Sequence, residues 1–201
     1  MHPLRKFWLI VLLMGAFICP ARGQGSATVR PWWVVAEFGE GQLQLTSDQV
    51  SGKRHTTFAL GFSGGHTLGD HARIGLEANG WLLQAFNLHD PTVGESVSNV
   101  AAVVDVFPIR SSPFFLRGGT GAAFYENRRP NASGGSGWCW SAGAGYEVRI
   151  SKNFGLAPMA MYSSGRLGDV RNATTTETGR SYSVVEFKAA FIFHFGRPGG
   201  R

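Results

Sequence analysis

The feature that most restricts the fold of this chain is a strict alternation of side chains in its last strand-like segment, Arg180–Phe195. One face carries Val185, Phe187, Ala189, Phe191, Phe193 and Phe195. The other face carries Val184, Glu186, Lys188, Ala190, Ile192 and His194. A period of two residues places successive side chains on opposite sides of an extended strand. The segment is therefore predicted to be a β-strand with one apolar face and one partly charged face.

Seven earlier segments are separated by turn-forming residues in a similar way. The eight predicted strands span Pro31–Thr46, Arg54–His66, Ala72–Phe86, Ser96–Ile109, Pro113–Glu126, Gly137–Ile150, Asn153–Ser164 and Arg180–Phe195. Short connections, predicted at Thr67–His71, Arg110–Ser112 and Ser151–Lys152, alternate with longer polar ones at Ser47–Lys53, Asn87–Glu95, Asn127–Ser136 and Gly165–Gly179. Short turns at one end and long loops at the other are typical of outer-membrane β-barrels.

The charged face of these strands also carries many Gly and Ala residues, and the chain contains 28 glycines in 201 residues. A polar surface in water does not need such small residues, but the crowded interior of an eight-stranded barrel does. We therefore expect an all-β, eight-stranded antiparallel up-and-down transmembrane β-barrel, with its apolar face toward lipid. The alternative is a soluble lipocalin-like carrier, in which the apolar face would point inward.

Charged residues recur on the face that is expected to line the lumen. They are Glu37, Arg73, Glu77, Asp105, Arg117, Glu147, Arg149, Glu186 and Lys188. Charges in a narrow interior must pair with one another or remain hydrated. We interpret the set as a structural network that fills the lumen, with Arg117 predicted to bind Asp105 and Glu147. A gated ion path is the alternative interpretation.

Aromatic residues are expected in two rings at the membrane interfaces. The ring near the short turns would contain Trp32, Trp33, Phe107, Phe114, Phe154, Phe193 and Phe195. The ring near the long loops would contain Trp81, Phe86, Phe124, Tyr125, Trp138, Trp140, Tyr162 and Tyr182.

Pro158 conflicts with an unbroken strand because it lacks an N–H, and a β-bulge is predicted there.

The N-terminus has the three parts of a secretory signal peptide. Arg5 and Lys6 precede an uncharged apolar run, and the small residues Ala21 and Gly23 predict cleavage before Gln24. Two domains follow from this: a signal peptide at 1–23 and an outer-membrane β-barrel domain at 24–201. Removing the signal lowers the net charge from +6 to +3, because it contains three basic residues and no acid. A net charge of only +3, without a run of consecutive basic residues, argues against nucleic-acid binding.

Three short motifs make the chain similar to the small outer-membrane barrels of the OmpA and OmpX type. They are Phe115-Leu116-Arg117-Gly118-Gly119-Thr120-Gly121, Gly143-Ala144-Gly145-Tyr146-Glu147 and the closing Phe187…Phe191-Ile192-Phe193-His194-Phe195. The resemblance implies a location in the bacterial outer membrane, contact with its lipids, and recognition of the last strand by the barrel-assembly machinery. This chain departs from that pattern by continuing for six residues after Phe195.

The functional prediction is a structural or surface-interaction barrel with a lumen filled by side chains, whose long loops meet ligands outside the cell. No catalytic, cofactor-binding or metal-binding residues are assigned, and no cofactor is expected. His55 and His89 have polar neighbours in sequence, but such proximity is common in loops. Two alternatives remain: a narrow porin-like channel for small solutes, and a membrane-embedded lipid A-modifying enzyme.

Overall fold

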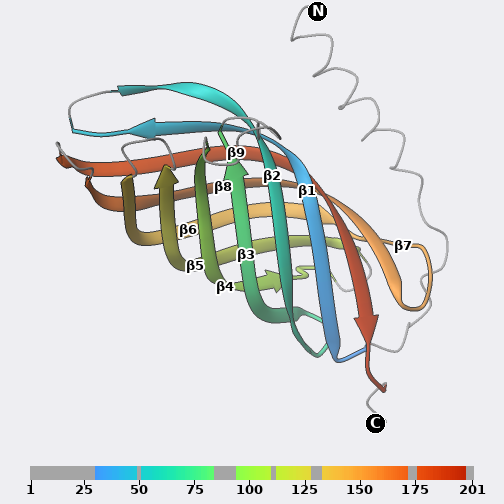
Figure 1. Ribbon diagram of the computed structural model, residues 1–201. Coiled ribbons are helices and arrows are strands. Elements are labelled where there is room, and N and C mark those ends of the chain that lie inside the picture. Colours follow the sequence, from blue (N-terminus) through green and yellow to red (C-terminus); the bar gives the residue numbers. More distant parts are fainter. Residues whose placement is uncertain are drawn as a thin grey trace, which may run out of the picture.

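The protein folds into long antiparallel strands that curve around a common interior (Figure 1). The computed structural model describes residues 30–48, 51–83, 94–109, 112–127, 133–171 and 176–197. The strands are β1 (Trp32–Thr46), β2 (Ser51–Leu68), β3 (Ala72–Leu82), β4 (Glu95–Val106), β5 (Phe114–Asn127), β6 (Ser133–Tyr146), β7 (Val148–Arg149), β8 (Phe154–Arg171) and β9 (Thr176–Phe195). The predicted signal peptide lies outside the described residues.

The sheet closes on itself and has no edge along most of its height. Strand order runs β6-β5-β4-β3-β2-β1-β9-β8-β7, and β6 also pairs with β8, which completes the ring. β6 and β7 pair with β8 in one register, Gly145 opposite Met159 and Val148 opposite Leu156, so they form one interrupted strand. Nine elements therefore make an eight-stranded antiparallel barrel, as the sequence predicts.

The strands are strongly tilted, which the register shows directly. The cross-strand partners of Trp32 run through His66, Ile74, Val104, Gly118, Ala142, Tyr162 and Val185. Val185 then pairs with Gln42, so one circuit returns to β1 ten residues beyond its start. Closing a sheet into a barrel requires a stagger of this kind, and eight strands leave an interior that side chains can fill.

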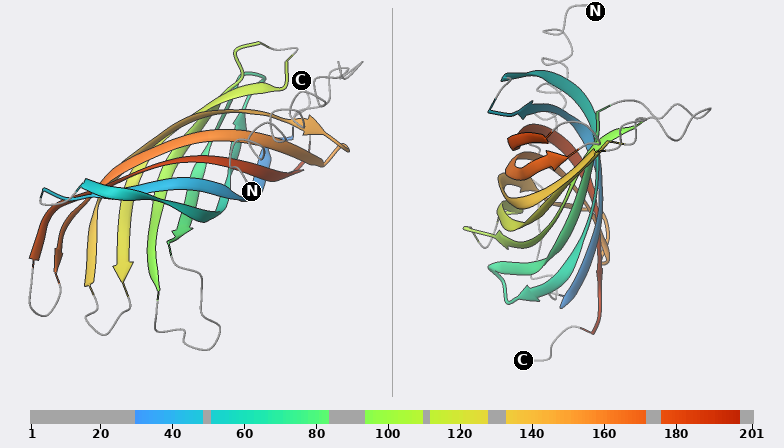
Figure 2. Two further views of the ribbon diagram at one scale, coloured as in Figure 1. Left: turned by 90° about the horizontal axis from the view of Figure 1, so that it is seen from above. Right: turned by 60° about the vertical axis from the view of Figure 1, so that its left-hand side comes forward.

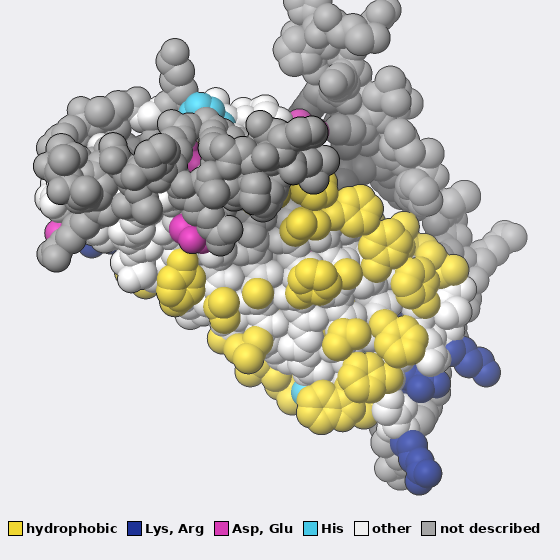
Figure 3. Space-filling view, in the orientation of Figure 1, with side chains coloured by type: hydrophobic (Ala, Val, Ile, Leu, Met, Phe, Trp, Pro, Cys, Tyr) yellow, Lys and Arg dark blue, Asp and Glu magenta, His cyan; other side chains and the backbone are white. Residues whose placement is uncertain are grey.

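The two faces of each strand lie as the alternation predicts. On β9, Val185, Phe187, Phe191, Phe193 and Phe195 are exposed, whereas Val184, Glu186, Lys188, Ala190, Ile192 and His194 are buried. Apolar side chains cover the outside of the barrel over several strands (Figure 3). This is the reverse of a soluble carrier, which would leave its charges outside, and it fits a surface that lipid covers.

Pro158 lies in β8 without the predicted bulge, so that prediction is wrong. The β8–β9 register runs unbroken through it, with Pro158 opposite Ala189. On the other side of β8, the pairing is interrupted between Gly145–Met159 and Val148–Leu156, which places Pro158 opposite Tyr146. The missing N–H of proline explains why the pairing lapses here, over two ladder positions, without any change of register.

The first and last described residues, Arg30 and Arg197, lie at one end of the barrel, here called the inner end, together with the turns at 69–71, 107–113 and 150–153. At the opposite, outer end, three of the four connections are shorter than predicted, because the strands continue through most of the expected loops. β8 and β9 contain 18 and 20 residues, whereas a membrane-spanning strand needs only about 9–11.

The extra length forms a projecting four-stranded sheet at the outer end, here called the outer sheet. It comprises residues 40–46 of β1, 51–57 of β2, 163–171 of β8 and 176–184 of β9. The hairpins β1–β2 and β8–β9 extend away from the rest of the barrel in Figure 2. The side of the barrel at β3 and β4 is lower, since those strands contain 11 and 12 residues.

Five aromatic residues assigned to the interfacial rings point inward instead, and one of them, Phe107, is only partly buried, against Phe115. Trp33, Trp81, Tyr125 and Tyr182 are all at most 3% exposed. Trp32, Phe193, Phe195, Phe124, Trp138, Trp140 and Tyr162 do lie on the outer surface, and Phe86 is outside the described residues. The four buried residues lie on the same face of their strands as the charged residues. The alternation of side chains, and not the position along the strand, therefore decides whether an aromatic residue points inward.

Candidate functional site: the charged lumen

A continuous series of oppositely charged side chains runs along the interior of the barrel. At the inner end it begins at Glu147, beside the interruption between β6 and β7. Arg73 Nη2 lies 2.5 Å from Glu147 Oε2, and Arg149 Nε and His194 Nε2 lie 3.2 and 2.9 Å from Oε1. Three nitrogen-bearing side chains therefore surround one carboxylate. Arg149 is the least enclosed of them, with 26% of its side chain exposed.

Arg73 connects this group to the middle of the barrel. Its guanidinium lies 4.6 Å from the ring centre of Phe107 and 5.6 Å from that of Phe115, and its Nε is 3.8 Å from Asp105 Oδ2. An arginine can stack on aromatic faces and bind carboxylates at its edge at the same time. Arg73 thus packs among apolar side chains while it retains anionic partners on both sides.

Arg117 is the centre of the series and contacts three carboxylates. Its Nε and Nη2 donate to Asp105 Oδ1 and Oδ2 at 2.6 and 3.0 Å. Its Nη1 donates to Glu37 Oε1 at 2.7 Å and to Glu77 Oε2 at 3.0 Å. The planar guanidinium has five donors in a fixed arrangement, which suits several carboxylates at once.

Lys188 continues the series toward the outer end. Its Nζ lies 2.7 Å from Glu37 Oε2 and 3.3 Å from Glu186 Oε1. Trp81 Nε1 then donates to Glu186 Oε2 at 2.7 Å. The indole belongs to an apolar cluster that fills the lumen above the charges and includes Leu43, Val97, Leu167 and Tyr182.

Eight of the nine predicted lumen residues are at most 4% exposed, and the ninth is Arg149. Ions removed from water in this way are tolerated only when their partners satisfy them. A second apolar cluster, with Trp33, Phe115, Met159, Met161 and Ile192, packs around the inner half of the series. The described lumen is therefore filled by paired charges between two apolar layers.

One predicted contact is wrong. Glu147 does not bind Arg117, because the cross-strand partner of Arg117 on β6 is Gly143, four residues away from Glu147. The predicted contact between Arg117 and Asp105 is confirmed, and the two residues are direct cross-strand partners. The sequence analysis also missed the roles of Trp81 and His194. Both lie on the same face of their strands as the charged residues, at even-numbered spacings from them, and this pattern could have identified them from the sequence.

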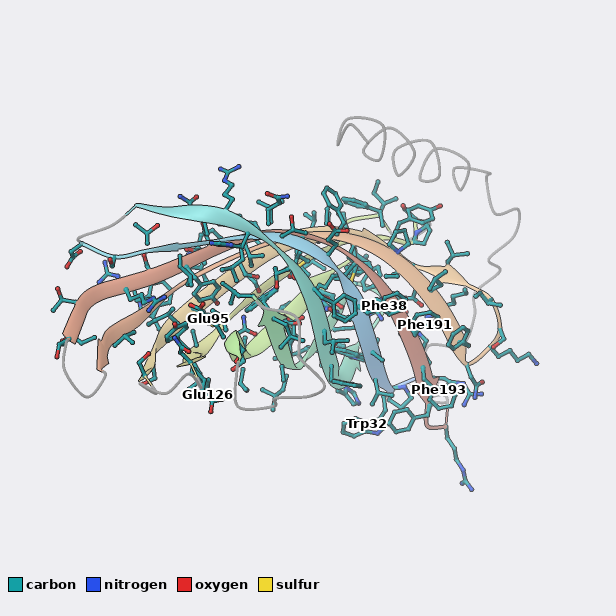
Figure 4. The ribbon with its side chains drawn as sticks, turned by 45° about the horizontal axis from the view of Figure 1, so that its top comes forward. Trp32, Phe38, Glu95, Glu126, Phe191 and Phe193 are labelled. Atoms are coloured by element: carbon teal, nitrogen blue, oxygen red, sulfur yellow. The ribbon has the colours of Figure 1, made fainter. Side chains whose placement is uncertain are left out.

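The outer end of the lumen is spanned by a second, smaller polar group. Arg180 of β9 reaches Glu95 of β4, with Nη2 3.2 Å from Oε1, and its guanidinium lies 4.1 Å from the ring centre of Tyr125 on β5. The Tyr125 hydroxyl donates to the same Glu95 oxygen at 2.7 Å. In Figure 4, Glu95 and Glu126 lie well away from Trp32 and Phe193, which mark the inner end. Residues from opposite walls thus meet across the outer opening.

Closed topology, an apolar exterior and a charged, filled interior together define a small outer-membrane-type β-barrel. Within the described ranges, no helix is long and apolar enough to cross a membrane. The same residues include no cluster of His, Cys, Asp or Glu suited to a metal ion.

Comparison with solved structures gives the same class. The fold is similar to Neisserial surface protein A, at 17% identity and a TM-score of 0.52, over 82% of this chain and 97% of that one. It is also similar to Ail, the attachment invasion locus protein of Yersinia pestis, at 12% identity and a TM-score of 0.55, over 82% of this chain and all of that one. No family profile and no curated protein sequence matches the chain. The barrel fold implied by the sequence resemblance is thus confirmed.

Proposed function

We propose that the protein is a bacterial outer-membrane barrel that acts at the cell surface. The side chains that fill its lumen have a structural role. The observation that carries this proposal is the outer sheet, which continues beyond the apolar belt. Its outward face is polar and includes Glu40, Gln42, Arg54, Thr56 and Arg166, all exposed. A broad polar sheet held rigid by a closed barrel is suited to contact with a partner outside the cell.

A similar barrel that binds a ligand supports this role. A second structure of Ail, with a TM-score of 0.55 and 13% identity, contains the heparin analogue sucrose octasulfate. The outer sheet of this protein mixes acidic and basic residues, with Glu40, Arg54 and Arg166 all exposed. The two remaining partners that we propose are outer-membrane lipids around the belt and the assembly machinery at β9.

Labelling of whole bacteria tests which end is outside. Thr178→Cys lies on the outer sheet and is exposed, whereas Lys152→Cys lies in an inner-end turn. Cys139 is buried and gives little background. A membrane-impermeant maleimide should label Thr178→Cys in intact cells and Lys152→Cys only after lysis. Labelling of both, or of Lys152→Cys alone, in intact cells would overturn the proposal.

Export follows from the same proposal and has its own test. We propose that residues 1–23 are removed and that the mature chain begins at Gln24. The intact mass of the protein recovered from membranes checks this. A mass that includes residues 1–23 would contradict it.

A further inference from the structure

The inner end of the barrel carries a group of basic residues that outnumbers its acids, although one of them, Arg149, is paired with Glu147. It consists of Arg30, Arg149, Lys152 and Arg197, here called the basic patch, and these residues are exposed or partly exposed. In the sequence, Asp70 is the only acid in the inner-end turns at 69–71, 107–113 and 150–153 and in the segments 24–31 and 196–201. Figure 3 shows basic side chains gathered at this end, beyond the apolar surface.

The fold brings the patch together from three neighbouring strands. Trp32 of β1 is the cross-strand partner of Phe195 of β9, so Arg30, just before β1, and Arg197, just after β9, lie on adjacent segments. Arg30 Nη1 donates to the carbonyl oxygen of Gly196 at 3.2 Å, which fixes the two ends together. The backbone N–H of His194 donates to Asn153 O at 2.7 Å, so the turn that carries Lys152 packs against the end of β9.

An exposed aromatic wall lies directly beside the patch on the lipid-facing side. Trp32 is 49% exposed and Phe193 is 46% exposed. Phe38 stacks on Phe191 at a ring separation of 5.5 Å, and Phe154 lies 6.1 Å from Phe191. Figure 4 shows Trp32, Phe38, Phe191 and Phe193 on β1 and β9, with Trp32 and Phe193 at the end near the basic patch.

We propose that the basic patch binds the phosphate of an anionic phospholipid whose acyl chains lie against this aromatic wall. An aromatic surface with cations beyond its end matches the amphipathic order of a lipid, in which a negative headgroup follows an apolar tail. A soluble anion would use the charges but not the wall. The inference rests on the proposed function, because it requires the apolar belt to lie in a bilayer.

Quenching of tryptophan fluorescence by brominated lipids tests the proposal in a Trp138→Phe/Trp140→Phe parent, in which Trp32, beside the patch, is the lipid-exposed tryptophan of the described residues. The refolded full-length barrel is placed in phosphatidylcholine vesicles that contain brominated phosphatidylglycerol or brominated phosphatidylcholine. The parent should bind phosphatidylglycerol in preference. Single substitutions Arg30→Gln, Lys152→Gln and Arg197→Gln should each lower that preference by up to about fivefold, since one basic residue near an anionic surface contributes about 1 kcal/mol.

The control is Arg54→Gln/Arg166→Gln, which removes two exposed charges from the outer sheet and should leave the preference unchanged. The proposal is overturned if the parent shows no preference, if the triple variant Arg30→Gln/Lys152→Gln/Arg197→Gln retains it, or if the control loses it equally. Loss of the preference in excess soluble glycerol phosphate would show a site for free anions and would also overturn it. Absence of quenching by either lipid would instead refute insertion, and with it the proposed function.

Discussion

Arg117 and Asp105 are direct cross-strand partners on β5 and β4, and two parallel hydrogen bonds of 2.6 and 3.0 Å join the guanidinium to the carboxylate. The other guanidinium nitrogen holds Glu37 and Glu77, which come from β1 and β3. One side chain thereby links four strands through the interior. The stability of the closed barrel should depend on it more than on any single surface ion pair.

Replacing Arg117 with Ala should destabilise the barrel by about 3–5 kcal/mol, because three buried carboxylates lose a shared cation. Urea unfolding in lipid vesicles measures the change. Adding Asp105→Asn to this variant should restore part of the loss by removing one uncompensated charge. An Arg117→Ala barrel as stable as the parent would show that the lumen charges are hydrated and not paired.

The hydrogen bond from Trp81 to Glu186 can be tested with a matched pair of buried tryptophans. Trp81→Phe should cost about 1–3 kcal/mol beyond the lost packing, since a buried carboxylate oxygen loses its donor at 2.7 Å. Trp33→Phe is the control, because Trp33 is equally enclosed but its Nε1 has no hydrogen-bond partner among the described residues. Equal losses for the two variants, measured by urea unfolding, would contradict this role of Trp81.

The barrel, its two faces and the membership of the charged lumen follow from period-two alternation, because a closed sheet forces every second side chain inward. Contacts across the lumen are less predictable. Glu147 is four residues from the register partner of Arg117 and binds Arg73 on β3 instead. Such pairings depend on tilt and stagger, which no single strand encodes. The outer sheet was missed because its strands consist of residues that also favour loops, such as Gly168 and Gly179, both with positive φ.

The lipid-facing assignment predicts a penalty for charge on the outside of the belt. Val104 is 41% exposed on β4 with its side chain outside the barrel. Val104→Arg should cost about 2–4 kcal/mol near the bilayer midplane. Thr56→Arg on the outward face of the outer sheet should cost far less, because that position lies beyond the apolar belt. Folding free energies of the two variants in vesicles check the difference, and similar values would contradict the placement of the belt.

Close approach of neighbouring strands explains Gly39 of β1. A Cβ atom there would lie 2.1 Å from the carbonyl oxygen of Phe187 on β9. Gly39→Ala should therefore destabilise the barrel by about 1–3 kcal/mol, because the strands must separate. Gly80→Ala is the control, since nothing lies within 4 Å of the new atom, and it should be neutral or slightly stabilising. Unfolding midpoints that rank the two variants in the opposite order would contradict this packing.

Paired charges and apolar layers close the lumen of the described barrel. Conductance of the purified, refolded protein in planar bilayers tests this closure most directly. The parent should show little steady current, because Arg117, Lys188 and their carboxylate partners occupy the interior between two apolar clusters. Stable open-channel currents from the pure parent protein would contradict the account and would favour a channel for small solutes.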